Sequence, residues 1–159
     1  MKRVILYRFD QKPVEAIVSP GSYLGENHIE LITVGGNLQI APYGEVKALC
    51  FASEPGRDDL FSEHNMFERR PKAPGLWTRF TLRDGDKLDG ILPHNLLDWP
   101  ASGYLITPPR AGANRQVVFI PRAALSGTEL RGVVGVSAVS EGIRRRVNRS
   151  ENQLTIFDR

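Results

Sequence analysis

The sequence predicts an all-β protein that is built from two small five-stranded units in tandem. Three observations lead to this prediction. Short apolar runs alternate with polar residues at the two-residue period of strands. Turn residues such as Pro20-Gly21 and Asp84-Gly85 separate these runs. No long segment holds the 3.6-residue apolar period of a helix, so long helices are not expected.

The first unit is assigned to residues 1–54, as a small β-barrel. Residues 14–18 alternate and stop at a Pro-Gly turn, and further strands are predicted at residues 28–34, 38–41 and 45–52. The apolar part of residues 1–8 is too short for a signal peptide.

The second unit is assigned to residues 75–138. Residues 79–83 and 87–92 alternate on either side of an Asp-Gly turn, which is a strong short-range hairpin signal. The remaining strands of this unit are predicted at residues 103–107, 116–120 and 128–136.

The order of strands and turns repeats between the two halves. Val14-Glu15-Ala16-Ile17-Val18 resembles Leu88-Asp89-Gly90-Ile91-Leu92 in its apolar and acidic positions. Residues 38–42 and 118–121 are apolar strands that each end in proline. One larger barrel or sandwich made of all ten strands is the alternative. Each unit alone is near the lower size limit for a stable core, so the two are expected to pack against each other.

Residues 55–74 are predicted to be a linker between the units. Residues 58–68 within it are expected to form a short helix, with Leu60, Phe61 and Phe67 facing a core.

Three runs in the second half resemble a known fold. Phe80-Thr81-Leu82-Arg83-Asp84-Gly85, Leu88-Asp89-Gly90-Ile91-Leu92 and Val118-Phe119-Ile120-Pro121, with Leu130 in the last strand, resemble the Sm-type small barrel, the SH3-like fold of Sm and Hfq proteins. The resemblance covers residues 78–134. It implies that Gly90 lets a strongly bent strand cross the barrel, and that residues 121–125 form a 3₁₀ turn.

The RNA pocket of the Sm proteins does not carry over to this chain. Residues 93–99 contain no Asp…Met-Asn element, and Pro121-Arg122-Ala123 stands where the family has Arg-Gly. An Sm-like barrel without that pocket keeps two functions open, which are nucleic-acid binding in another manner and structural self-assembly of barrel modules.

Charge and cysteine content narrow the class of protein. Residues 1–60 carry six basic and eight acidic groups (−2), residues 61–140 carry ten and seven (+3), and residues 141–159 carry five and three (+2). This is a sparse basic face for strong capture of nucleic acid. The single cysteine, Cys50, fits a cytoplasmic location, and no apolar run is long enough to span a membrane, so no membrane partner is expected.

No catalytic, metal or cofactor site is predicted. His28, His64 and His94 have no metal-ligand spacing, and Cys50 lies in an apolar run where cysteine behaves as a small buried hydrophobe. The sequence therefore predicts a protein that is not an enzyme. Trp77 and Trp99 either cap the ends of a small barrel or, beside neighbouring arginines, form a stacking platform for single-stranded nucleic acid.

The C-terminal residues 139–159 are predicted to be a flexible basic tail that ends in a binding peptide. Gln153-Leu154-Thr155-Ile156-Phe157 resembles the sliding-clamp-binding peptide of bacterial replication and repair proteins, Gln-Leu-x-Leu-Phe. The resemblance implies that these five residues dock on a protein partner, with a bacterial DNA sliding clamp as the candidate. The alternative is a last strand packed on a barrel.

Arginines supply the candidate nucleic-acid contacts. Four lie in the tail before the peptide, and two lie in the long loop at residues 108–115. They are Arg144, Arg145, Arg146, Arg149, Arg110 and Arg115. The function predicted from the sequence is thus a non-enzymatic binding or adaptor protein tethered through its C-terminal peptide. An Sm-like protein that binds RNA or single-stranded DNA, and a structural self-assembling barrel module, are the alternatives.

Overall fold

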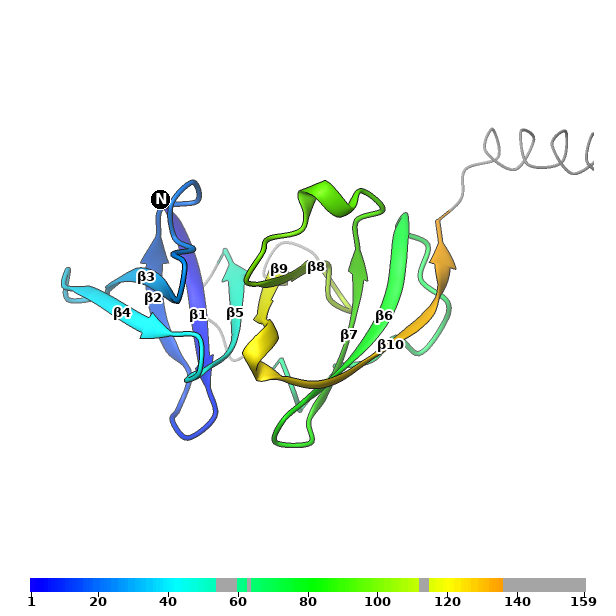
Figure 1. Cartoon of the computed structure of the whole chain (residues 1–159), viewed down its shortest axis with the longest axis horizontal. Coiled ribbons are helices and arrows are strands. Elements are labelled where there is room, and N and C mark those ends of the chain that lie inside the picture. Colours follow the sequence, from blue (N-terminus) through cyan, green and yellow to red (C-terminus); the bar gives the residue numbers. More distant parts are fainter. Residues whose placement is uncertain (54–59, 63, 112–114, 136–159) are drawn as a thin grey trace, which may run out of the picture.

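The computed structural model describes residues 1–53, 60–62, 64–111 and 115–135, and these residues form an all-β structure, which confirms the predicted class (Figure 1). Two 3₁₀ helices accompany the strands, and no α-helix occurs among the described residues. The elements in chain order are β1 (Lys2–Arg8), β2 (Val14–Val18), β3 (His28–Thr33), β4 (Leu38–Pro42), β5 (Val46–Ala52), β6 (Gly75–Leu82), β7 (Lys87–Leu92), η1 (Leu96–Asp98), β8 (Gly103–Ile106), β9 (Arg115–Pro121), η2 (Arg122–Ala124) and β10 (Leu125–Val134).

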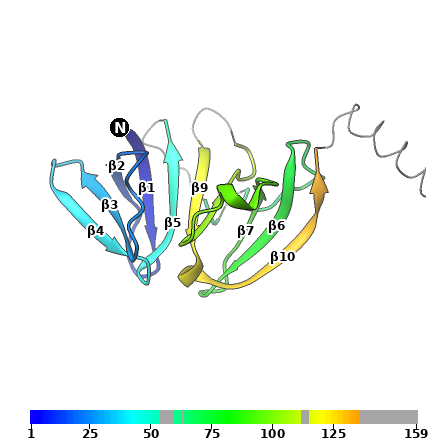
Figure 2. The same ribbon diagram turned by 45° about the horizontal axis from the view of Figure 1, so that its top comes forward.

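The strands form two open antiparallel sheets. A seven-stranded sheet has the order β4-β3-β2-β1-β5-β9-β8, and a three-stranded sheet has the order β10-β6-β7. Figure 2 shows β5 and β9 side by side where the larger sheet passes from one half of the chain to the other. Two separate closed barrels were expected, and this expectation is corrected, because both halves share a sheet and the described residues close no barrel. All seven residues of β5 are buried. Other residues must therefore pack on both faces of this strand, and another strand must pair with its free edge.

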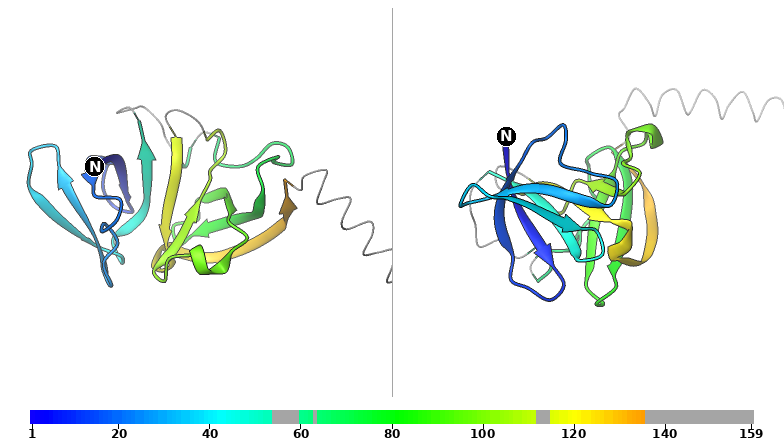
Figure 3. Two further views of the ribbon diagram at one scale, coloured as in Figure 1. Left: turned by 90° about the horizontal axis from the view of Figure 1, so that it is seen from above. Right: turned by 60° about the vertical axis from the view of Figure 1, so that its left-hand side comes forward.

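The strand order repeats between the halves. In the first unit, β1 to β5, hydrogen-bonded neighbours follow the order β5-β1-β2-β3-β4. In the second unit, β6 to β10, the order is β10-β6-β7, and a bridge between Ile91 and Thr107 leads on to β8, which pairs with β9. The two units lie on opposite sides of the β5–β9 junction (Figure 3).

The two hydrophobic cores meet across β1 and β5. Val4 and Leu6 face the core of the first unit, into which Phe119 of β9 also packs. Ile5 and Tyr7, on the other face of β1, pack into the core of the second unit with Phe80. The expected packing of the halves against each other is therefore observed. It is intimate, because one pair of strands serves both cores.

The helix expected at residues 58–68 is absent from the described part of that segment, where residues 60–62 and 64–68 form turns and bends. Its backbone is engaged by β7 instead. The carbonyl of Asn65 accepts from the amide of Asp89 at 2.7 Å, and the amide of Phe67 donates to the Asp89 carboxylate at 3.0 Å. These long-range bonds replace the local bonds of a helix, while Leu60 remains fully buried as expected.

Several local features agree with the sequence prediction. The Asp84-Gly85 hairpin is formed, with Gly85 at φ 94°, where only glycine is unstrained. The 3₁₀ turn expected at residues 121–125 is η2. Gly90 lies where β7 crosses β8, and a Cβ at this position would collide with Ile106.

Candidate functional site

The outer edge of β10 is the most exposed part of the described structure that is still regular strand. Among the described residues β10 pairs with β6 alone, along one side. Most of its residues are exposed, including the apolar Leu130 (63% exposed) and Val133 (39%). One guanidinium, from Arg70, donates to the Val133 carbonyl at 2.6 Å. A long exposed strand with apolar side chains is a template for pairing with another chain, and we call it the β10 edge.

A second edge of this kind is formed by β4, which pairs with β3 alone among the described residues. Leu38 (68% exposed) and Ile40 (54%) project from it into solvent. The register aligns Leu38 with Ile32 and Ile32 with Ile17, so an apolar row crosses three strands beside this edge. Shallow hollows of about 90 and 200 Å³ flank Ile17 on the same face. We call this strand with its outward side chains the β4 edge.

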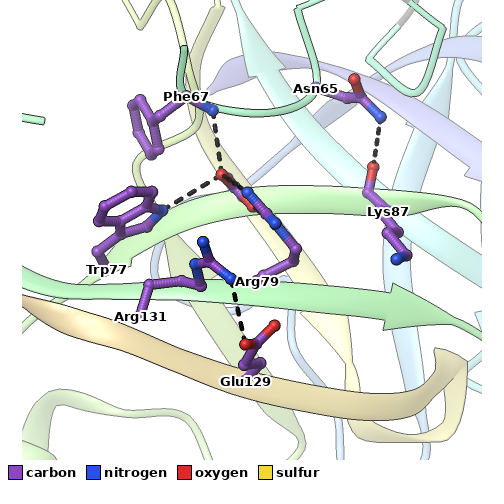
Figure 4. Close-up of polar contacts among 8 residues, drawn as sticks. Asn65, Phe67, Trp77, Arg79, Lys87, Glu129 and Arg131 are labelled. Carbon is purple, nitrogen blue, oxygen red and sulfur yellow. Dashed lines mark hydrogen bonds and ion pairs between the residues drawn. The ribbon is translucent and has the colours of Figure 1, made fainter. Parts of the chain in front are cut away.

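Asp89 organises the side-chain cluster of the second unit, in which Phe67, Trp77 and Arg79 all bond to it. Figure 4 labels these three residues. The Asp89 carboxylate is fully buried and accepts two hydrogen bonds from the Arg79 guanidinium, at 2.7 and 3.1 Å. The indole of Trp77 and the amide of Phe67 also donate to it. The hydrogen bonds to Asp89 raise the pKa of Arg79 above its ordinary value. The cluster joins the linker and β6 to β7 through Asp89. Its role is therefore structural.

Arg79 and Arg131, on the outer face of the three-stranded sheet, are each paired with a carboxylate. Arg131 lies over the Trp77 ring, with 5.5 Å between its guanidinium carbon and the ring centroid, and it also bonds Glu129 at 3.1 Å. Figure 4 shows Trp77 against Phe67 in this layer. Trp99 instead donates to the Pro93 carbonyl and packs edge-on against Tyr104 next to the core. Trp99 is therefore a cap of the second unit, whereas Trp77 presents a half-buried ring beside paired charges.

An ion network crosses the junction between the units. Lys47 of β5 bonds Asp84 at 2.6 Å and also Asp86, both from the turn between β6 and β7, and it lies over the ring of Phe61. Burial alone would lower the pKa of Lys47, but its hydrogen bonds to the two carboxylates outweigh this and raise it. Burial likewise opposes ionisation of Asp84, yet the bond from Lys47 holds the pKa of that carboxyl below its ordinary value. This contact was not predicted, because nothing in the local sequence pattern relates Lys47 to a turn in the other half.

Most of the residues predicted to bind partners lie outside the described residues. These are Gln153, Leu154, Thr155, Ile156 and Phe157, together with Arg144, Arg145, Arg146 and Arg149. Of the two predicted loop contacts, Arg110 is exposed at φ 54°, and Arg115 begins β9, where its backbone pairs with Ala52 and its side chain is not described.

The remaining sequence candidates form no catalytic or metal-binding arrangement within the described residues. His28 contacts Glu30 at 3.2 Å, while His64 and His94 are exposed on separate segments. Cys50 is buried in β5, as predicted for a small hydrophobe. In the described part of the chain no three His, Cys, Asp or Glu side chains are grouped to hold a metal ion, and no helix there is long and apolar enough to span a membrane.

These features define an all-β protein with two sheets, in which β4 and β10 each end a sheet of the described residues and carry exposed apolar side chains. The model of DUF6982, a family of unknown function, matches residues 1–132, and the chain belongs to that family. The match includes all of β4 and most of β10. No curated protein and no solved structure matches the chain.

Proposed function

We propose that the protein is a non-enzymatic binding or adaptor protein whose folded part takes partner polypeptides at its strand edges. The β10 edge carries this proposal. It offers ten residues of strand, bonded on one side to β6 among the described residues and exposed along most of its length. An extended segment added there gains main-chain hydrogen bonds along its length, and alternate side chains contact Leu130 and Val133.

We also propose that each unit is an opened form of the Sm-like small barrel. Three observations support this interpretation. Both units share one strand order, η2 joins the last two strands of the second unit, and Gly90 stands where β7 crosses β8. Short connections of equal length, residues 43–45 and Arg122–Ala124, precede the last strand of each unit.

Strand addition can be tested with a library of ten-residue peptides selected on the immobilised full chain. Selected peptides should bind the wild-type chain and lose binding to Leu130→Lys. A lysine on an edge strand disfavours the addition of another strand, because pairing would bury its charge against an apolar peptide. Leu97→Lys is the matched control, since Leu97 is also exposed (92%) but lies on η1. Peptides that bind both variants equally, or no selected peptide at all, would refute the proposal.

The C-terminal peptide supports a second contact, with a bacterial sliding clamp as its proposed partner. Its residues Leu154, Ile156 and Phe157 are apolar anchors of the kind that fill a hydrophobic cleft. Each could contribute about 1.5–3 kcal/mol on full burial. Ordering the peptide offsets much of this, so a Kd of about 1 μM is expected. Alanine at Leu154 and Phe157 should abolish capture by purified clamp and leave thermal unfolding unchanged. A large fall in Tm would show that the segment is a core strand.

Binding of RNA or single-stranded DNA is the competing proposal, favoured by the tail arginines and by the half-buried ring of Trp77. Within the described residues, however, Arg79 and Arg131 are each paired with a carboxylate beside that ring. Nucleic-acid binding would show as affinity for an oligonucleotide that falls steeply with salt, whereas strand addition and clamp binding would not.

A further inference from the structure

The pairing of β5 with β9 is an interface between the two units inside one chain. It is antiparallel, and its register joins Leu49 to Phe119 and Cys50 to Val118. These four residues are at most 1% exposed, so the junction is as well packed as the interior of either unit. It shows that the last strand of one unit pairs stably with the fourth strand of another.

The repeated strand order makes the two outer edges the counterparts of this junction. By position in their units, β10 corresponds to β5 as the last strand, and β4 corresponds to β9 as the fourth. The junction uses the last strand of the first unit and the fourth strand of the second. Among the described residues, the fourth strand of the first unit and the last strand of the second each end a sheet and remain without a partner from the other unit.

We propose that the β10 edge of one copy of this protein pairs with the β4 edge of a second copy, repeating between chains the β5–β9 pairing seen within the chain. The inference rests on the proposed function and names the polypeptide that pairs with the two edges, which is a second copy of this chain. It does not depend on the C-terminal peptide. Pairing would cover Leu38 and Ile40 on one copy with Leu130 and Val133 on the other.

The internal junction favours this combination over a contact between two equal edges. It joins a last strand to a fourth strand, and the two outer edges are again one last strand and one fourth strand. No net charge of either edge opposes the contact, because β4 has no charged residue and Glu129 and Arg131 of β10 bond each other. A head-to-tail contact between unlike edges is therefore preferred.

The positions of the edges show what such a contact would build. In Figure 1, β4 and β10 lie at opposite ends of the molecule, and Figure 3 agrees. One copy cannot join its own two edges, and a second copy bound at β10 still offers its own β10. A head-to-tail contact of this kind closes into a ring or continues as a filament, depending on the rotation between copies.

The test is the mass of the full chain in solution, measured by analytical ultracentrifugation over a range of concentrations, with Ile40→Lys and Leu130→Lys as edge variants. The wild-type chain should form assemblies larger than a dimer. Each variant alone should associate at least about tenfold more weakly. Leu97→Lys is the control and should assemble like the wild type. Thermal unfolding verifies that both edge variants fold, since both side chains are exposed.

The decisive sample is a mixture of the two edge variants. Ile40→Lys keeps a good β10 edge and Leu130→Lys keeps a good β4 edge, so the mixture should form a dimer with one copy of each. A wild-type chain that stays monomeric, or a mixture that does not dimerise, overturns the inference. Assembly that responds only to Leu130→Lys would overturn it in favour of β10–β10 pairing. A monomer whose β10 edge still takes selected peptides would overturn self-assembly and leave the proposed function intact.

Discussion

In the first unit, β2 and β3 are hydrogen-bonded neighbours, and the register pairs Ala16 with Thr33 and Ile17 with Ile32. The corresponding strands of the second unit, β7 and β8, meet in the described residues at the single bridge between Ile91 and Thr107. The same strand order is thus held together by a continuous ladder in one unit. In the second unit, β7 and β8 share only that bridge, so contacts between side chains must stabilise the pair instead.

Two corresponding sequence positions show where the difference arises. Glu15 on β2 is exposed, whereas Asp89 on β7 is fully buried beneath the linker. Ala16 has room for its Cβ in the core of the first unit, whereas a Cβ at Gly90 would collide with Ile106. The same pattern of residues is therefore exposed at one position of β2 and buried at the corresponding position of β7. The linker causes this difference, because its backbone bonds to β7 and covers Asp89.

The largest effect that this comparison predicts is at Asp89. Asp89→Ala leaves the Arg79 guanidinium and the Trp77 indole without their shared acceptor and should lower the free energy of unfolding by about 3–5 kcal/mol, the usual result of breaking a buried pair. Glu15→Ala, at the corresponding position of the first unit, should change it by less than about 0.5 kcal/mol. Urea unfolding of the two variants measures both values. Equal, small changes would show that the buried pair does not hold the second unit together.

Local signals were sufficient to predict the hairpin at Asp84-Gly85 and most strand positions, because each depends on neighbouring residues. The turn η2 was expected only from the resemblance to the Sm-type barrel. β1 was missed. Its Val4 to Tyr7 run is continuously apolar, since one face of the strand packs into each core and the alternating pattern disappears.

The linker helix and the separate barrels were wrong for a different reason. Residues 64–68 bond to β7 and β5 bonds to β9, and both contacts join segments far apart in the sequence. The candidate edges depend on those same contacts. Which strand ends a sheet is decided by all the other pairings, so neither β4 nor β10 carries a local mark of being an edge.

The smaller effect lies one residue further along each strand. Gly90→Ala puts a methyl group against Ile106 and should cost about 1–3 kcal/mol, as overpacking of a core does. The reverse change in the first unit, Ala16→Gly, should cost about 0.5–1 kcal/mol, because glycine weakens a strand interior without creating a clash. Ile106→Val removes the terminal Cδ1 methyl group, which is the atom nearest to a Cβ added at Gly90, and keeps the Cβ of residue 106, which is the next nearest, so the clash is relieved in part. In urea unfolding, the double variant Gly90→Ala with Ile106→Val should therefore lose less stability than the sum of the single variants.

If Gly90→Ala alone leaves the free energy of unfolding unchanged, the crossing of β7 over β8 tolerates a side chain at residue 90. Glycine there would then reflect something other than the close approach of the two strands, and the contrast between the units would rest on Asp89 alone.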